Sequence, residues 1–255
     1  MPAKACVVLV GCRGRMGQRL ARDLTHAGYQ VHGFDREATA PAVQEAASQA
    51  RFVILAVPVA AMAHATAMVA PGLGPETILL DIASVKTVPL RQMLEATTTP
   101  VVGLHPLFGP ETAAPLRVAV VPGRGEEAVQ TACNLMTDLG YSPFCTSAQD
   151  HDQAMAYLQG LNFLTTVAYL CAAPNLDLAP YLPPSFGRRM EAAAKLVGED
   201  AALFTSLVDA NPYSLEAARR FRAYLNVAAS GELELLSRKA ESMLWWWRSL
   251  NREGP

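Results

Sequence analysis

The sequence lacks an excess of charge of either sign. Its 21 lysine and arginine residues face 23 aspartate and glutamate residues, which gives a formal net charge of −2. No block of like charge interrupts this balance. Nucleic acids and anionic membranes select proteins with a concentrated positive surface, so neither is expected as the main partner.

Paired cysteines and long apolar runs are also missing. The five cysteines are scattered without a Cys-x-x-Cys spacing, so neither a disulfide framework nor a metal site is expected. No apolar run reaches membrane-spanning length without proline, glycine or charge. A strand begins by Ala5 and leaves no room for a signal peptide, so we expect a cytoplasmic protein.

The first 35 residues read as a strand, a glycine turn, a helix and a second strand. The apolar run Cys6–Val10 leads into Gly11-Cys-Arg-Gly-Arg-Met-Gly17, and the strand over Val31–Phe34 ends at Asp35. Glycines let the backbone approach a pyrophosphate, and an acid about twenty residues on can accept from a ribose hydroxyl. We predict dinucleotide binding; the alternative is a structural turn in a cofactor-free domain. The predicted cofactor-binding residues are Gly11, Arg13, Gly14, Met16, Gly17 and Asp35.

This glycine pattern departs from the usual Gly-x-Gly-x-x-Gly spacing. Cys12 occupies the first glycine position of that pattern, so we take Gly11 as the turn residue instead. The carboxylate of Asp35 would repel a 2′-phosphate, which favours NAD as the cofactor. Arg36 is adjacent and would partly reverse that preference, so NADP stays open.

Strand and helix patterns alternate up to about residue 147. Further apolar strands are expected over 52–57, 77–82, 101–104 and 118–121, with helices near 41–50, 60–70 and 125–139. Such alternation predicts an α/β fold, with a Rossmann-type doubly wound parallel sheet over residues 1–148. Val57 and Pro58, at the end of the third strand, are expected beside the cofactor.

The remaining residues, 149–255, predict an all-α domain for substrate binding and dimerisation. The stretch from His151 to Ala173 is apolar on nearly every helical face, so this helix is expected to be buried. More helices are predicted near 186–197, 200–209, 213–229 and 232–250. Together with Trp245-Trp-Trp247, this is more apolar surface than a small domain needs, so we expect a homodimer. The alternative is that the tryptophans fill the core of the monomer.

Polar residues at the carboxyl ends of predicted strands suggest where the chemistry lies, because ligands of open α/β sheets bind there. His105 ends one strand, and an imidazole with a pKa near 6.5 suits proton abstraction. Ser84 follows the preceding strand and is expected to hydrogen-bond His105 and fix its tautomer. Ser84 does not lie on a Gly-x-Ser-x-Gly turn, which argues against a serine hydrolase.

The sequence leaves the roles of two further residues open. Lys86 would hold an anion or form a structural ion pair, and the sequence does not choose between these. His151 lies at the start of the long helix beside Asp150 and Asp152. We expect it to stabilise the junction between the domains, and a direct catalytic role is the alternative.

Four motifs together resemble the prephenate dehydrogenase family, especially the branch fused to a chorismate mutase. In order, they are Gly11-x-x-Gly-x-Met-Gly17, Leu80-Asp-Ile-Ala-Ser-Val-Lys86, Gly103-Leu-His-Pro-Leu-Phe-Gly-Pro110 and Asp150-His-Asp-Gln-Ala-Met-Ala156. The resemblance covers nearly the whole chain. It implies NAD(P)-dependent oxidative decarboxylation of a cyclohexadiene in aromatic amino acid biosynthesis, with His105 as base and Ser84 as its partner. No residues precede the first strand to form a mutase, so that activity is not expected.

Departures from the family pattern fall where the resemblance places the substrate. Phe163, beside Asn162, replaces a histidine that lies near the substrate side chain in the family. Lys195 replaces an arginine that grips the ring carboxylate, and a lysine cannot make the bidentate contact. Arg188 is the alternative carboxylate ligand. The implied substrate-binding residues are Ser84, Lys86, His105, Gln159, Phe163, Arg188 and Lys195.

These departures suggest that the chemistry is retained while the substrate or its feedback control has changed. We favour 4-amino-4-deoxyprephenate, the substrate of a relative in antibiotic pathways, with prephenate on the route to tyrosine as the other choice. Two alternatives stay open. A β-hydroxyacid or imine reductase is disfavoured because the hydroxyacid enzymes use a lysine on the long helix, and residues 151–173 contain none. A non-catalytic NAD-binding sensor would give no reason for His105.

Overall fold

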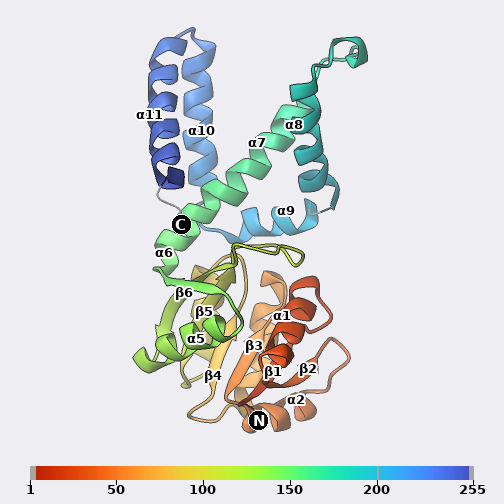
Figure 1. The fold of residues 1–255 in the computed structure, drawn as a ribbon, viewed down its shortest axis with the longest axis vertical. Helices are drawn as coiled ribbons and strands as arrows, with labels where there is room; N and C mark the ends of the chain where they lie inside the picture. Colours follow the sequence, from red (N-terminus) through yellow and green to blue (C-terminus); the bar gives the residue numbers. More distant parts are fainter. Residues whose placement is uncertain (1–3, 200, 253–255) are drawn as a thin grey trace.

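The computed structural model describes residues 4–199 and 201–252 (Figure 1). A seven-stranded sheet in the order β2-β1-β3-β4-β5-β6-β7 forms the first part of the chain. Its strands are β1 (Cys6–Val10), β2 (Gln30–Phe34), β3 (Phe52–Leu55), β4 (Ile78–Asp81), β5 (Val101–Pro106), β6 (Arg117–Arg124) and β7 (Ser142–Cys145). The predicted α/β fold with a Rossmann-type sheet is confirmed.

The sheet is not wholly parallel, which corrects the sequence-based prediction. Strands β1 to β5 run parallel, β6 pairs antiparallel with β5, and β7 is parallel to β6. A parallel neighbour requires a crossover segment, usually a helix, whereas the loop over 107–116 joins β5 to β6 without one. The edge strand β7 was not predicted, because its four residues are mostly exposed and include Pro143.

Helices cover both faces of the sheet and close a core on each. Helices α1 (Arg15–His26) and α5 (Glu126–Asp138) pack on one face. Helices α2 (Ala40–Ser48), α3 (Met62–Val69) and α4 (Thr87–Ala96) pack on the other. Strands β3 and β4 are buried along their whole length, as expected for apolar strands between two helical layers.

The described residues after β7 form only helices. Helix α6 (Ala148–Met155) continues through a π-helical segment, η3 (Ala156–Leu161), into α7 (Asn162–Cys171). A short 3-10 turn, η4 (Ala179–Tyr181), follows. Helix α8 (Pro184–Ala194) then runs into a second π-helical segment, η5 (Lys195–Glu199). The chain ends in α9 (Ala201–Ala210), α10 (Ser214–Ala229) and α11 (Leu233–Arg252). This confirms the predicted all-α second part over the described residues.

Figure 1 shows that these helices form two arms that diverge from the sheet. One arm contains α7 and α8, and the other is the hairpin of α10 and α11. Helix α9 crosses between the arms and the sheet, and it contacts η1 (Val59–Ala61), the turn that follows β3. The helical part therefore touches the sheet at the carboxyl end of its central strands.

One expectation about burial is wrong for the monomer, and one alternative is excluded. The long helix is not buried, because Tyr157, Leu158 and Tyr169 are exposed. The tryptophans do not fill the core of the monomer, since Trp245 is 72% exposed and its two neighbours are also exposed. No helix among the described residues is both long and apolar enough to cross a lipid bilayer.

Candidate functional site

The turn after β1 has the backbone geometry that its glycines require. Gly11 has a φ of +87°, and a Cβ there would lie 2.3 Å from the carbonyl oxygen of Ala56. A Cβ on Gly17 would lie 2.1 Å from the carbonyl oxygen of Gly11, so α1 packs directly on the turn. Gly11 is thus the turn residue, as predicted, and the turn leaves a cradle free of side chains at the start of α1. That cradle fits a pyrophosphate.

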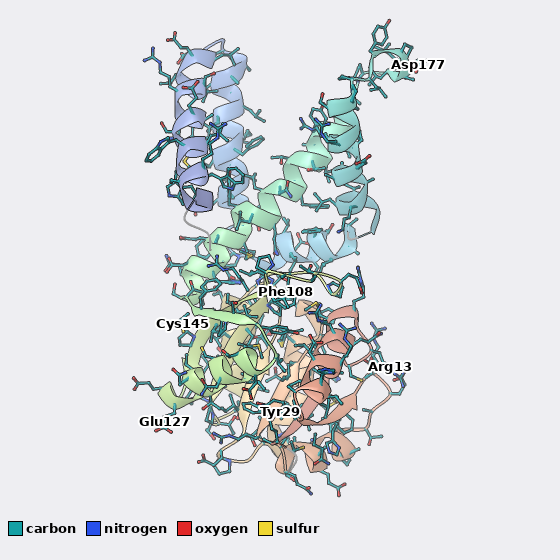
Figure 2. All side chains as sticks on the ribbon, in the orientation of Figure 1. Arg13, Tyr29, Phe108, Glu127, Cys145 and Asp177 are labelled. Carbon is teal, nitrogen blue, oxygen red and sulfur yellow. The ribbon has the colours of Figure 1, made fainter. Side chains whose placement is uncertain are left out.

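Asp35 lies at the end of β2 beside this turn. Its carboxylate accepts hydrogen bonds from the backbone N–H groups of Arg13 and Arg36, each at 3.0 Å. These two hydrogen bonds lower the pKa of Asp35, so it is ionised near neutral pH. An ionised acid fits a ribose hydroxyl and disfavours a 2′-phosphate. The Arg13 side chain points outward (Figure 2) and pairs with Glu37 at 2.9 Å.

The residues after β3 line the same turn. A methyl carbon of Val57 lies 3.2 Å from the position that a Cβ on Gly11 would take. Pro58 follows and precedes η1, the turn on which α9 packs. The structure therefore gathers the glycine turn, Asp35 and Val57 at one edge of the sheet, and their cofactor roles stay predictions.

His105 lies near the carboxyl end of β5 and is only 3% exposed. Its Nδ1 is 2.9 Å from Nε2 of His151, and the two rings meet edge to face at 5.1 Å. Burial lowers the pKa of His105 well below 6.5, and positive charge on His151 or Lys86 acts in the same direction. The imidazole of His105 is therefore neutral at pH 7 and able to accept a proton.

His151 and Asp152 belong to α6 and were not included in the predicted site. Nδ1 of His151 lies 2.8 Å from the carboxylate of Asp152. That carboxylate also accepts the backbone N–H groups of Lys86 at 2.7 Å and Thr87 at 2.8 Å, at the start of α4. Burial works to raise the pKa of Asp152, but the hydrogen bonds from His151 and from the Thr87 and Lys86 backbones outweigh it and lower the pKa. The sequence signal that could have identified this pair is the His-Asp-Gln motif at the start of the predicted long helix.

Lys86 is buried in a structural ion pair, and a contact between Lys86 and the substrate stays a prediction. Its side chain is fully buried, with Nζ at 2.5 Å from Asp81 and 2.7 Å from the carbonyl oxygen of Leu104. Burial lowers the pKa of Lys86, while the Asp81 carboxylate opposes that shift. A Cβ on Gly103 would lie 3.0 Å from the Lys86 chain, so this glycine gives the lysine its place beside β5. The structural ion pair, left open by the sequence, is the arrangement found.

Ser84 is half-buried on the segment between β4 and α4. Among the described residues its hydroxyl makes no hydrogen bond to His105, and His151 occupies the position that the sequence assigned to Ser84. The expectation that Ser84 fixes the tautomer of His105 is therefore wrong for this structure. A contact between Ser84 and the substrate stays a prediction.

The loop after His105 is held by α1. The Arg19 guanidinium donates to the carbonyl oxygens of Pro110 and Thr112, each at 3.0 Å. Phe108, labelled in Figure 2, lies 5.0 Å from Tyr141 in an edge-to-face contact. The helix that starts at the glycine turn therefore also anchors the loop that follows the candidate base. No motif in the sequence indicated Arg19.

The residues predicted for the substrate end lie on the helical arms. Phe163 is buried and stacks on Phe204 with 5.6 Å between ring centroids. Gln159 is half-buried in the π-helical segment η3, a feature frequent at functional sites. Arg188 on α8 and Lys195 at the start of η5 are exposed, and neither forms an ion pair among the described side chains. The structure does not bring these two cations into contact with His105.

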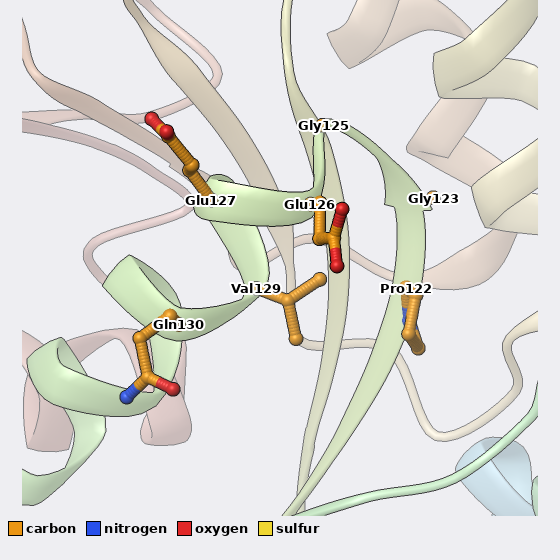
Figure 3. A pocket seen from close by; sticks show the side chains of 7 residues that line it. All are labelled: Pro122, Gly123, Gly125, Glu126, Glu127, Val129 and Gln130. Atoms are coloured by element: carbon orange, nitrogen blue, oxygen red, sulfur yellow. The ribbon is translucent and has the colours of Figure 1, made fainter.

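A separate hollow, shown in Figure 3, opens between the end of β6 and the start of α5. Arg124, at that end of β6, pairs with Val101 at the amino end of β5. The hollow is therefore at the opposite edge of the sheet from His105. Within the described residues, no cluster of His, Cys, Asp or Glu is arranged to hold a metal ion.

Comparisons with known proteins agree with this arrangement. Residues 24–119 match the family model described as "Prephenate dehydrogenase, nucleotide-binding domain". The chain is 34% identical over 225 residues to the T-protein of Enterobacter agglomerans and 32% identical over 209 residues to that of Haemophilus influenzae. These matches cover 84% and 79% of this chain. The chain belongs to the prephenate dehydrogenase family.

The chain spans 59% of the Enterobacter protein and 55% of the Haemophilus protein. A crystal structure of prephenate dehydrogenase from Aquifex aeolicus, in complex with hydroxyphenyl propionate and NAD+, has the same fold. It matches with a TM-score of 0.75 and 18% identity, over 98% of this chain and 96% of that one. The match extends over both the sheet and the helical arms.

Proposed function

We propose that this protein catalyses the NAD-dependent oxidative decarboxylation of a prephenate-type cyclohexadiene to an aromatic pyruvate. The observation that carries the proposal is the buried, neutral His105 at the same edge of the sheet as the glycine turn. The family supports the reaction type and NAD as the cofactor.

The glycine turn, Val57, Pro58 and Asp35 would hold NAD+. When bound, it would accept the hydride that leaves C4 of the substrate. The backbone of Gly11 and Gly17 would lie against the pyrophosphate, because neither position has room for a Cβ. Asp35, held ionised by the backbone N–H groups of Arg13 and Arg36, would accept from a ribose hydroxyl.

His105 would take the proton of the C4 substituent. Its lowered pKa keeps the ring neutral at pH 7, so the base is ready before substrate binds. Loss of electrons at C4 would draw out CO2 and leave an aromatic ring, and this aromatisation is the driving force. The main tasks of the protein are therefore to orient the substrate and the cofactor and to provide one base, and strong electrostatic stabilisation is less important.

The substrate we favour is 4-amino-4-deoxyprephenate, with prephenate as the other choice. The support is the set of departures at the substrate end. Phe163 presents a ring, stacked on Phe204, where the family resemblance implies a histidine. Lys195 stands where it implies an arginine, and an ammonium holds a carboxylate as a point charge without a bidentate contact. His105 can serve as base for either an amine or a hydroxyl at C4.

We also infer that two copies of the chain associate through the helical arms. The apolar side chains exposed on α10 and α11 include Leu225, Leu244, Trp245 and Trp246. Exposed apolar surface of this extent marks an interaction site, and a second copy of the same surface is the simplest complement.

A comparison of turnover tests the proposed substrate. Purified protein with NAD+ is given prephenate and 4-amino-4-deoxyprephenate separately, and formation of NADH and CO2 is followed. We expect turnover of both, with the higher kcat/KM on the amino compound. A strong preference for prephenate removes the amino assignment. If neither compound is turned over although NAD+ binds, the result favours the alternative of a non-catalytic NAD-binding sensor.

A further inference from the structure

A continuous chain of buried hydrogen bonds joins the sheet to α6 behind His105. It runs from the Asp152 carboxylate to Nδ1 of His151 at 2.8 Å, then from Nε2 of His151 to Nδ1 of His105 at 2.9 Å. The three residues are between 0% and 3% exposed. Such burial excludes water from the nitrogens that face one another, so the protons between them must be shared within the chain.

The chain determines which nitrogen of each ring carries a proton. The ionised carboxylate of Asp152 only accepts hydrogen bonds, so Nδ1 of His151 must be the donor. A neutral His151 then has its lone pair on Nε2, and Nδ1 of His105 must donate to it. The lone pair of neutral His105 therefore lies on Nε2. That atom makes no hydrogen bond among the described residues, and it is not fully buried. It retains some access to the outside.

We propose that Asp152 and His151 are positioning residues that fix the basic tautomer of His105 and take up its second proton. The inference rests on the proposed function, in which His105 is the base. As the C4 substituent gives its proton to Nε2 of His105, the proton on Nδ1 of His105 moves to Nε2 of His151. The positive charge then lies on His151, against the Asp152 carboxylate. After product formation, the proton on His151 returns to Nδ1 of His105, and Nε2 of His105 releases its proton to water.

The other charged groups around the pair favour this direction of transfer. The Lys86 ammonium lies at the carbonyl of Leu104, next to His105, and opposes a positive charge on that ring. Asp81 is already paired with Lys86 at 2.5 Å. Asp152 is thus the carboxylate left to balance a protonated histidine. The N-terminus of α4 and the Asn211 side chain, which donates to the Asp152 backbone carbonyl at 2.8 Å, hold Asp152 in place.

Two substitutions of His151 separate positioning from proton uptake. The amide of His151→Gln can accept from His105 and donate to Asp152, but it cannot take a proton. His151→Leu removes both interactions. We expect kcat to fall about 10- to 100-fold in the first variant and further in the second, with KM little changed, since general base catalysis contributes about 10²–10⁴-fold. His64→Asn, an exposed histidine on α3, is the matched control and should be silent.

A proton inventory in H2O and D2O mixtures gives the readout that a purely structural role would not move. We expect a curved inventory in the parent protein, from two protons in motion, and a linear one in His151→Gln. A linear inventory in the parent, or unchanged kcat and inventory in His151→Gln, would overturn the proton transfer.

The tautomer is tested without any substrate. In protein labelled with 15N-histidine, ring nitrogen shifts should show His105 protonated on Nδ1 and free on Nε2, and His151→Leu should lose that preference. A proton on Nε2 of His105 in the parent protein overturns the inference even if turnover is observed. The expected shifts in a protein that turns over neither substrate would support the tautomer assignment and refute the proposed function instead.

Discussion

The sheet and the helical arms differ in how completely each buries its own apolar residues. The sheet has a closed core on each face, and its two central strands are inaccessible to solvent. Beyond residue 148, the buried apolar residues of the described chain are few. They are Met155, Ala156, Phe163, Ala193 and Leu207. The sheet half is therefore complete by itself, whereas the helical half presents apolar surface that a partner would cover.

The two halves also differ in the proposed roles of their residues. His105 and the glycine turn lie on the closed half, where dense packing holds each atom in place. Lys195 and Arg188 lie exposed on the open half, where substitution costs little stability. The motifs that agree with the family lie mostly on the closed half, and the departures lie on the open half. The predictions below test that contrast.

The largest effect should come from the candidate base on the closed half. We expect His105→Asn to lower kcat/KM by about 10²–10⁴-fold because it removes the proposed base for the C4 proton. NAD+ affinity, measured by fluorescence titration, should stay within twofold or so. Turnover at the parent rate would show that the base lies elsewhere.

On the open half, a charge placed among the exposed tryptophans should break the proposed dimer. Trp245→Glu removes the burial of a large apolar side chain from both copies, worth about 1.5–3 kcal/mol each. We expect the dissociation constant of the dimer to rise on the order of 100-fold or more. Light scattering across a dilution series measures this change. Ser237→Glu adds the same charge at an exposed polar site on α11 and should leave the dimer intact. A monomeric parent protein would contradict the inferred association.

Two glycines separate backbone strain from a steric clash in the closed half. Gly11 and Gly28 both have positive φ, at +87° and +89°, but only Gly11 has atoms within 4 Å of a Cβ. Both alanine variants should lose about 1–2 kcal/mol of unfolding free energy from the left-handed backbone. Only Gly11→Ala should also weaken NAD+ binding, by about tenfold or more, since the clash with Ala56 must displace the turn. Equal affinities in calorimetric titrations would sink this assignment.

The two exposed cations should differ in their effect on substrate binding. We propose that Lys195 holds the ring carboxylate, so Lys195→Ala should raise KM about fivefold with kcat little changed. That corresponds to roughly 1 kcal/mol for an exposed ion pair. Arg188→Ala serves as the paired comparison and should leave KM unchanged. The opposite result would assign the carboxylate to Arg188.

The smallest effect concerns stability against acid. The pKa of His105 is lowered in the folded protein, so below about pH 6.5 the unfolded chain binds a proton that the folded protein resists. Folding stability should therefore fall as pH drops from 6.5 toward the folded pKa, by at most about 1.4 kcal/mol per pH unit for this residue. Urea unfolding of the parent protein and His105→Asn at pH 7.5 and 5.5 should show the parent losing more. An equal loss in both would mean that His105 is not the source.

Much of the fold could be predicted from local pattern. Apolar runs of strand length, the glycine turn and Asp35 gave the Rossmann-type sheet because each is a property of neighbouring residues. The antiparallel β6 and the edge strand β7 could not be predicted in the same way. Strand direction depends on whether a connection crosses the sheet, and β7 has no apolar alternation to mark it.

The site was predicted in part. His105 and Ser84 were predicted because of their places at strand ends, but position along the chain does not say which groups touch. The sequence left Lys86 open between an anion ligand and an ion pair, because its place after a strand does not show that its side chain is buried against Asp81. The partner of His105 came from α6, 46 residues further along the chain. The apolar pattern of the long helix indicated more apolar surface than one small domain can cover, but it did not indicate which residues of the monomer stay exposed.

By itself, the sequence determined the α/β class, the glycine cradle, the histidine at a strand end and the family. These depend on residue types at short spacings, which fix local backbone conformation. Only the tertiary structure decided the partners of that histidine and the pairing of Lys86 with Asp81. Those choices depend on which buried polar groups meet when distant segments pack, because each must find a hydrogen-bond partner once water is excluded.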